Sequence, residues 1–428
     1  MNRIRQSSSS RKGVITIQML VILVPVLLVL MGFAIDLGQM YIVRAELKQA
    51  ANAMALAAAQ RLNGTDVALE HAATARQAAI SNAAAIGNKF NFGSLIIGES
   101  GGFLNSATQE PEYFDTAGGA TGEGENTSGG AAGGTTAKYV RVSLTADAPL
   151  TFFAFLALGA ERKTQIATTA IAGQSAPLCE ACAIENLAIA ALDPADLIDF
   201  GFVKNTRYTM SQSCTGFPPP QPLGNTTARL DYLMIDRQDT GATLFADPSQ
   251  QIFRIGQAGM PGNKTAAAGC IRIGGSENVW ENAAPLQCAF NQLPGAVQAF
   301  LCGIATRFDG SSLPAQCQIV GELDTIVATN IPDTDLTDLD DYAAYTGNGR
   351  RVITIPIVEA LLPGGGMVVL GFRQFLVQPL TGQTQFNPAD PSGRFTASYV
   401  GSVMPLRQGR FDGNCGLTTG PGKVVLFR

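Results

Sequence analysis

The residue pair best suited to chemistry in this chain is a C-x-x-C, formed by Cys179 and Cys182. Such a pair serves as a redox thiol or as half of a zinc site. A zinc site would need a second pair, and the sequence holds no other C-x-x-C. We therefore expect both cysteines to form structural disulfides, with thiol redox chemistry and metal binding as the alternatives.

All eight cysteines lie beyond residue 178. An even number confined to one region is typical of a protein in an oxidising compartment. Spacing alone does not choose among the roughly 105 pairings that eight cysteines allow. The disulfide candidates are Cys179, Cys182, Cys214, Cys270, Cys288, Cys302, Cys317 and Cys415.

A second candidate site is an acidic segment, IPDTDLTDLDDY, because closely spaced carboxylates can chelate calcium. An EF-hand loop would need Gly at its sixth position and Glu at its twelfth, but the chain has Asp338 and Ala344 there. A solvated acidic loop is the plainer interpretation, and a loose calcium site is the alternative. Its ligands would be Asp333, Asp335, Asp338, Asp340 and Asp341.

Other catalytic chemistry has little support in the sequence. The one histidine, His71, lies in a polar, Ala-rich helical stretch, where we expect a solvent-facing side chain. The glycines at 364–366 precede Met367 rather than a Lys-Ser/Thr pair, which predicts a hairpin turn and not a phosphate loop. The net charge is −5, with no basic block beyond the N-terminus, so nucleic-acid binding is not expected. We predict no enzyme activity and no cofactor.

The chain has an apolar run at residues 14–35, ahead of all the candidate sites above. As a helix it spans a hydrocarbon core of about 30 Å. Four basic residues and no acid precede it, so the positive-inside rule predicts a cytoplasmic tail at 1–13 and an extracytoplasmic chain from Asp36 onward. The run is longer than a signal-peptide core, so we expect the anchor to be retained.

The apolar run continues directly into a second helix, an amphipathic one, at about residues 37–62. Together they predict one helix of about 49 residues and about 73 Å, which Pro25 is expected to bend. Two sets of positions spaced seven apart form an a/d seam: Met40, Leu47 and Met54, and Val43, Ala50 and Ala57. We expect the seam to pack on the chain's own later domain. Packing of Met40 to Ala57 on another envelope protein, as a homo- or hetero-oligomer, is the alternative.

This N-terminal segment resembles the TadE/TadG-like proteins of Flp (Tad) pilus assembly. The resemblance rests on an ordered set of residues: Gly13, Pro25, Ala34-Ile35-Asp36, Gly38, Tyr41, Arg44, Leu47 and Ala50-Ala51. Residues 139–173 are also similar to the strand, Phe-rich turn and strand of TadG-like proteins. The resemblance implies a bacterial envelope protein of pilus biogenesis or secretion, with a helix-plus-sheet layout similar to pilins.

The sequence differs from related families at two motifs, and both differences limit the functions that the resemblance implies. Many TadG-like proteins carry a von Willebrand A domain with a D-x-S-x-S metal site, but the nearest match here, starting at Asp309, ends in Leu313. Prepilins cleaved after Gly carry Glu at the fifth mature position, and counting from Gly13 that position is Gln18. Cleavage at Gly13 and entry into a filament therefore lose support, although Gln18 remains a polar group suited to contact another helix.

The rest of the chain divides into two expected regions. Residues 36–175 form a helical stem with a small sheet, interrupted by a flexible Gly-rich loop at 115–137. The Phe-rich turn, with Phe152, Phe153, Phe155 and Leu156, is expected in the core, or else as an exposed apolar loop. Residues 176–428 are a β-rich domain in which Pro356 marks an edge strand or a bulge. Its strand candidates are 187–192, 251–255, 270–273, 351–358, 367–378, 395–404 and 424–427.

The sequence thus predicts an α+β chain: one transmembrane helix, a long amphipathic helix with a pilin-like sheet, and a disulfide-containing β-rich domain. The favoured function is a non-catalytic component of Tad/Flp pilus biogenesis in the bacterial inner membrane, single-pass, with its bulk in the periplasm. A surface-displayed adhesin or minor pilin is one alternative. A periplasmic thiol or metal-dependent enzyme that uses Cys179 and Cys182 is another.

Overall fold

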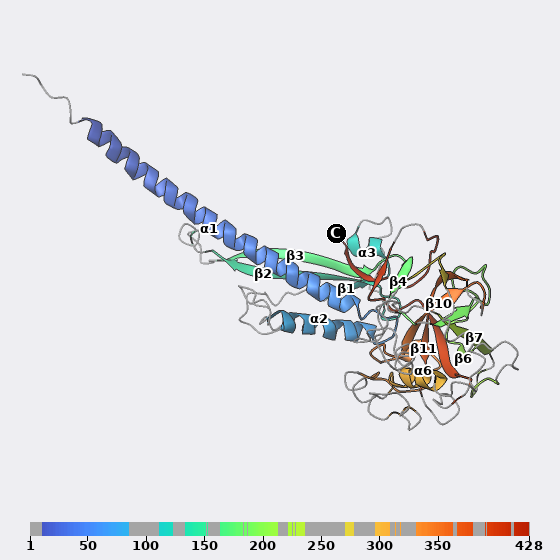
Figure 1. The fold of residues 1–428 in the computed structure, drawn as a ribbon. Coiled ribbons are helices and arrows are strands. Elements are labelled where there is room, and N and C mark those ends of the chain that lie inside the picture. Colours follow the sequence, from blue (N-terminus) through green and yellow to red (C-terminus); the bar gives the residue numbers. More distant parts are fainter. Residues whose placement is uncertain are drawn as a thin grey trace, which may run out of the picture.

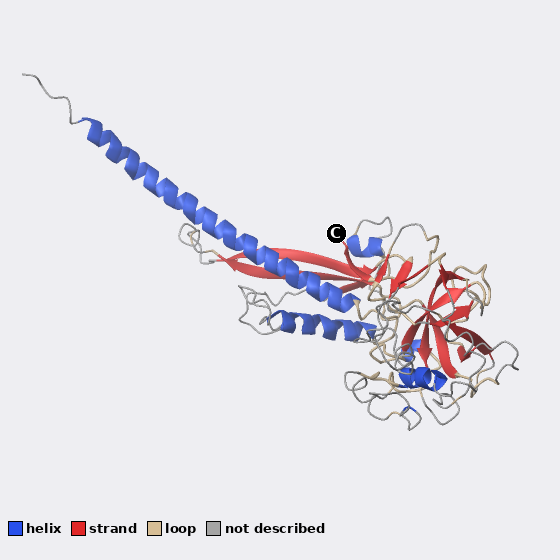
Figure 2. Cartoon of the chain, viewed as in Figure 1, coloured by secondary structure: helices blue, strands red, loops and turns tan. Residues whose placement is uncertain are grey.

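A computed structural model shows a long helix that extends from a small sheet and a β-rich body (Figure 1). Two long strands lie beside the long helix, and most strands gather in the body at the end far from the N-terminus (Figure 2). The structure describes residues 11–84, 111–122, 133–150, 152, 163–182, 184–185, 187–212, 221–224, 226, 228–235, 270–277, 296–308, 313, 317, 331–362, 366–379, 390, 392–411 and 415–427.

The N-terminal helix, α1, is a single helix of 49 residues, Arg11–Ala59, which continues through Pro25. This confirms the long apolar helix that the sequence predicts. By length and composition, α1 is the one helix among the described residues that could cross a membrane. Its large apolar side chains between Ile17 and Leu37 are 43–68% exposed, which would be costly in water and is favourable in lipid.

The second half of α1 lies along a four-stranded antiparallel sheet, the stem sheet. Its strands, in the order β1-β2-β3-β14, are Glu112–Phe114, Tyr139–Pro149, Lys163–Gln174 and Val424–Phe427. A second helix, α2, Ala68–Ala84, packs beside α1. The last strand therefore returns to the stem sheet, and the region 176–423 is an insertion between β3 and β14.

The predicted Gly-rich loop contains ordered structure at both of its described ends. Residues Ala117–Thr121 form a short helix, α3, whose N-terminus is capped by the Thr116 side chain. Ala120 and Ala137 are buried. The expectation of an open loop throughout 115–137 was wrong at these positions, because Arg141 holds α3 against the sheet by donating to the Ala120 carbonyl. Residues 123–132 lie outside the described part.

The inserted region contains a closed six-strand barrel. The strands follow the order β10-β5-β7-β6-β12-β11, and β11 pairs back to β10. Two neighbouring pairs, β10–β5 and β6–β7, are parallel. The short strand β9, Ser276–Glu277, extends β11 on its other side. The barrel strands are β5 Leu187–Ala190, β6 Arg207–Gln212, β7 Ala228–Met234, β10 Val352–Val358, β11 Met367–Val377 and β12 Phe395–Gly401.

Alternate residues of all six strands form one apolar cluster, so this cluster fills the barrel. Aromatic rings dominate it: Phe202 lies 5.6 Å from Phe375, and Tyr232 lies 5.8 Å from Phe300, ring centre to centre. Phe300 comes from helix α6, Ala296–Ala305, which packs on the same cluster. The barrel therefore gives this region a core independent of the stem.

A three-stranded sheet lies between barrel and stem in the order β13-β4-β8. Its strands are β13 Gly409–Arg410, β4 Glu180–Cys182 and β8 Cys270–Arg272. Side chains of β4 and β8 cover the outer face of the barrel through a cluster that includes Ala181, Ile271, Leu233 and Phe372. The sequence did not predict β4, β6, β7, β9 or β13.

The strand candidates at 187–192, 270–273, 351–358, 367–378, 395–404 and 424–427 each contain an observed strand. The candidate at 251–255 lies outside the described residues. β10 and β11 are antiparallel, and their register shifts between Ile357 and Val358, one residue past Pro356. The turn predicted at the triple glycine lies mostly outside the described residues. β10 is not an edge strand, because it pairs with β5 as well as β11.

One ion pair is buried inside this region. The Arg307 guanidinium donates to the Glu185 carboxylate, and both side chains are 2% exposed. Arg307 also donates to the Arg350 carbonyl at 2.7 Å. Burial raises the pKa of the Glu185 carboxyl to about 8, and the Arg307 charge and hydrogen bond offset only part of that rise. The pair ties the segment before β5 to the end of α6.

Glu185 predicts a pH dependence of stability. Its pKa is higher in the folded chain than in the unfolded chain, so the folded state binds more protons between about pH 5 and pH 8. The free energy of unfolding should therefore fall as the pH rises through this window, by up to about 1.4 kcal/mol per unit for one proton. Denaturant titrations across the window should show this slope reduced in Glu185→Gln. The exposed control Glu359→Gln should keep the wild-type slope, and equal slopes in all three proteins would contradict the assignment.

Candidate functional site: the covered face of the N-terminal helix

The acidic segment is built into the fold. Asp333 and Asp335 are buried, so the expectation of a solvated loop was wrong for these two residues. Asp333 accepts hydrogen bonds from the Tyr345 hydroxyl and from the Arg351 N–H. Burial by itself raises the pKa of the Asp335 carboxyl, but hydrogen bonds from Thr337 and Thr346 bring it below its ordinary value. Both carboxylates therefore fix the conformation of the segment around them through hydrogen bonds.

The other three aspartates bond to the first residue of β6 and to the loop before it. Arg207 donates to Asp338 at 2.6 Å and to Asp340 at 3.0 Å. Asp341 accepts from the Asn205 side chain at 2.8 Å and caps the 3-10 turn η4, Tyr342–Ala344. Each of the five acids thus has a partner within the protein. A calcium ion would have to compete with these bonds.

The two cysteines of the C-x-x-C do not bond to each other. Cys179 pairs with Cys415, and Cys182 pairs with Cys270. A third disulfide joins Cys302 to Cys317. The expected disulfides are confirmed for these six residues, while Cys214 and Cys288 lie outside the described part of the chain. Cys179 is 2% exposed, so this sulfur has little access to a substrate thiol.

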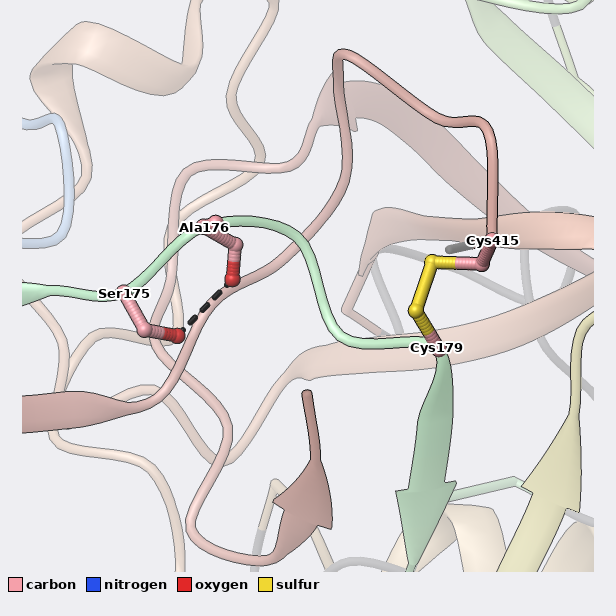
Figure 3. Close-up of a disulfide and its surroundings, with 4 residues drawn as sticks. All are labelled: Ser175, Ala176, Cys179 and Cys415. Atoms are coloured by element: carbon pink, nitrogen blue, oxygen red, sulfur yellow. Dashed lines mark hydrogen bonds between the residues drawn. A yellow bond between two sulfur atoms is a disulfide. The ribbon is translucent and has the colours of Figure 1, made fainter. Parts of the chain in front are cut away.

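The Cys179–Cys415 bond closes the inserted region at its base (Figure 3). The outgoing and returning segments also hydrogen-bond to each other, from the Ser175 N–H to the Lys423 carbonyl at 2.8 Å and from the Leu178 N–H to the Pro421 carbonyl at 3.1 Å. Ser175 donates in turn to the Ala176 carbonyl (Figure 3). The disulfide therefore staples the two chain crossings between stem and barrel.

Among the described residues, one group has the proximity that a metal needs: Glu180, Cys182 and Cys270. Two of its three ligand atoms are the sulfurs of the Cys182–Cys270 disulfide. A cysteine binds a metal as a thiolate, and a disulfide sulfur carries no such charge. The group therefore does not fit a metal while the bond is intact. His71, half-buried on α2, does not belong to it.

The covered face of α1, which we define as Gly32, Asp36 and the buried positions from Val43 to Ala59, is the surface that this helix buries against the rest of the chain. Its apolar members lie on alternate residues of β2, including Val140, Val142 and Leu144. The cluster contains alanines from both the helix and the sheet, and such small side chains let a helix approach its neighbour closely. The buried positions are Val43, Leu47, Ala50, Ala51, Met54, Ala55, Ala58 and Ala59.

The predicted seam residues lie in different environments along α1. Val43, Leu47, Ala50 and Met54 are buried, and Met40 packs at the border of the cluster. Ala57 is only half-buried, whereas Ala51, Ala55 and Ala58, which are not part of the predicted seam, are fully buried. A straight helix drifts by about 20° per heptad, which moves the covered face away from a strict seven-residue repeat. Gln18 and Pro25 are exposed in the apolar half of the helix.

Polar contacts fix both ends of this face. At the membrane end, the Asp36 carboxylate is fully buried and accepts from the Phe152 N–H at 3.0 and 3.1 Å. At the other end, the Gln174 side chain donates to the Leu62 carbonyl at 3.2 Å and to the Val403 carbonyl at 2.9 Å. Gln174 therefore joins the turn after α1, the stem sheet and the inserted region at one point.

Two further contacts bind the end of α1 to the inserted region. The Tyr342 hydroxyl donates to the Asn63 carbonyl at 3.0 Å, and the Asp66 N–H donates to the Ala343 carbonyl at 2.8 Å. Tyr342 stacks on Tyr345, which carries the bond to Asp333. Gly64 turns the chain between them with a φ of +79°, a conformation that favours glycine. The acidic segment thus anchors the helix end to the inserted region.

The covered face lies within a segment that matches a known family. Residues 13–61 match the family described as putative Flp pilus-assembly TadE/G-like. This segment is a Tad domain. The Tad domain ends two residues beyond α1, so the match covers the anchor and the covered face and leaves out the sheet and the barrel. No curated protein and no solved structure matches the chain significantly.

Sequence reasoning named Asp36 as a helix-packing residue but missed Gly32 and the contacts from outside the Tad domain. Gly32 lies one turn before Asp36 on the covered face, and this spacing was a readable signal. Gln174 and Tyr342 gave no signal, because their partners are 112 and 279 residues away in the chain. The strand β7 did carry a signal in its first part, since Leu230 and Tyr232 alternate with the charged residues Arg229 and Asp231.

A pair of matched substitutions tests the covered face of the Tad domain. Ala51 is fully buried and Ala45 is exposed on the same helix. Ala51→Leu should destabilise the contact by about 1–3 kcal/mol through overpacking, whereas Ala45→Leu should have little effect. Hydrogen exchange of β2 and β3 amides should then speed up by about 5- to 150-fold in Ala51→Leu only. Equal exchange in both variants would contradict the packing.

Proposed function

We propose that the chain is a non-catalytic envelope component of Tad/Flp type IVc pilus biogenesis and secretion. In this proposal α1 anchors it in the bacterial inner membrane, with the N-terminus in the cytoplasm and the stem and barrel in the periplasm. The observation that carries the proposal is the coincidence of the Tad match with α1, which is lipid-compatible in its first half and docked in its second.

Charge and redox chemistry support this orientation. The basic residues before the apolar run favour a cytoplasmic N-terminus. The disulfides belong to an oxidising compartment, and all three lie on the other side of the span. Tyr41, 75% exposed and just beyond Asp36, is the kind of residue that concentrates at membrane–water interfaces.

Exposed residues of α1 offer surfaces for pilus-assembly partners. Gln18 is a polar group within the apolar half, where it can hydrogen-bond to another transmembrane helix. Leu37 and Ile42 are exposed beyond the apolar run, on the side of α1 that the stem sheet leaves uncovered. We propose that partners bind α1 here, since the covered face is occupied by the chain's own sheet.

The two alternatives have less support. A thiol enzyme would need Cys179 and Cys182 to exchange with each other, but each is bonded to a distant cysteine. A filament subunit would need cleavage at Gly13 and a charged group in place of Gln18. A metal-dependent enzyme would have to open the Cys182–Cys270 bond.

Deletion and complementation test the proposal. A strain that lacks the gene should lose nearly all surface Flp pili, and the wild-type gene should restore them. The Ala45→Leu gene should restore them as well, whereas Ala51→Leu should restore fewer. Pili are counted by electron microscopy, and chain levels by immunoblot. Normal pilus number and normal secretion in the deletion strain would contradict the proposal.

A further inference from the structure

The strands β2 and β3 run along α1 toward its apolar half, past the N-terminal end of the amphipathic half. The two strands stay in register over eleven pairs, from Tyr139 opposite Gly173 to Pro149 opposite Lys163. Phe152 lies past the last pair, and its N–H reaches the Asp36 carboxylate. Asp36 directly follows the apolar run, so the two strands arrive where the predicted membrane span ends.

Gly32 shows that the contact continues into the apolar run. It is buried, whereas the large apolar residues around it, including Val29, Phe33 and Ile35, are 45–48% exposed. A Cβ added at Gly32 would overlap the ring and the Cβ of Phe152. The ring therefore lies against a glycine notch one helical turn before Asp36, about 6 Å further along the axis toward the N-terminus.

Phe152 is itself 36% exposed. Its free edge lies at the level of side chains that face lipid if α1 spans the membrane. Its N–H is already satisfied by Asp36, as any backbone group near hydrocarbon must be. The same bond keeps a buried carboxylate paired at the membrane boundary, where an unpaired charge would be costly.

We propose that Phe152, just past the last pair of β2 and β3, is a second membrane contact, seated in the outer leaflet against Gly32. The occupant of its exposed edge is lipid, because this edge is continuous with the exposed apolar surface of α1. Gly32 leaves room for the Phe152 ring, and Asp36 accepts a hydrogen bond from the Phe152 N–H. The contact would fix the tilt and rotation of the stem relative to the membrane. This inference rests on the proposed anchoring of α1.

Fluorescence quenching tests the proposal in the full chain, reconstituted into phosphatidylcholine–phosphatidylglycerol vesicles. The chain has one tryptophan, Trp280, which is replaced by Phe so that each introduced tryptophan reports alone. Phe152→Trp, the tip probe, is compared with Leu23→Trp, the lipid control in the apolar run. The water control is Val203→Trp, at a position 63% exposed on a loop of the barrel region. Quenchers are lipids brominated near the top of the acyl chain, and iodide in the buffer.

The expected result is that brominated lipid quenches the tip probe to an extent comparable with the lipid control, and that iodide quenches it several-fold less than the water control. Gly32→Leu should displace the ring and increase iodide quenching of the tip probe. If iodide quenches the tip probe as strongly as the water control, or if neither quencher reaches it, the inference is overturned in favour of water or a protein partner. If the lipid control also escapes the brominated lipid, the anchoring itself fails, and the proposed function with it.

Discussion

The close packing of the alanine-rich face of α1 on β2 and β3 is the contact that joins the N-terminal helix to the rest of this molecule. An isolated amphipathic helix beyond a membrane would be free to bend away from its span. Here, buried small side chains bring helix and sheet together, and Asp36 and Gln174 fix the two ends of the contact. The stem therefore continues from the apolar half of α1, and Gln174 and Tyr342 link the turn after α1 to the inserted region.

The barrel depends on the stem through a few specific connections. The chain leaves the stem after β3 and returns to it as β14, and the Cys179–Cys415 bond joins the two crossings (Figure 3). Tyr342 and Ala343 bind the turn after α1 from the inserted side. This arrangement explains why a redox role fits the C-x-x-C poorly. Its two sulfurs have separate structural tasks, one closing the base of the insertion and one joining β4 to β8.

The sequence predicted features that depend on local periodicity and missed those that depend on distant partners. The length of α1, the β2–β3 pair and the presence of disulfides followed from apolar patterns, composition and cysteine count. β6 was missed because Thr209, Ser211 and Gln212 are polar yet buried, so the strand shows no simple alternation. Barrel closure, the return of β14 and the cysteine pairs join residues far apart in the chain, for which spacing carries no information. The covered face was predicted only in part, because a straight helix departs from the heptad repeat.

The central claim is that the covered face of α1 packs on the chain's own sheet and not on another protein. Incorporation of a diazirine analogue of leucine, followed by illumination of intact cells, tests it most directly. Leu47 is fully buried in this contact, and the analogue differs little from leucine in shape. The account predicts that cross-links from the Leu47 peptide join it to peptides of β2 or β3 within the same chain. Cross-links from Leu47 mainly to a different polypeptide would contradict it.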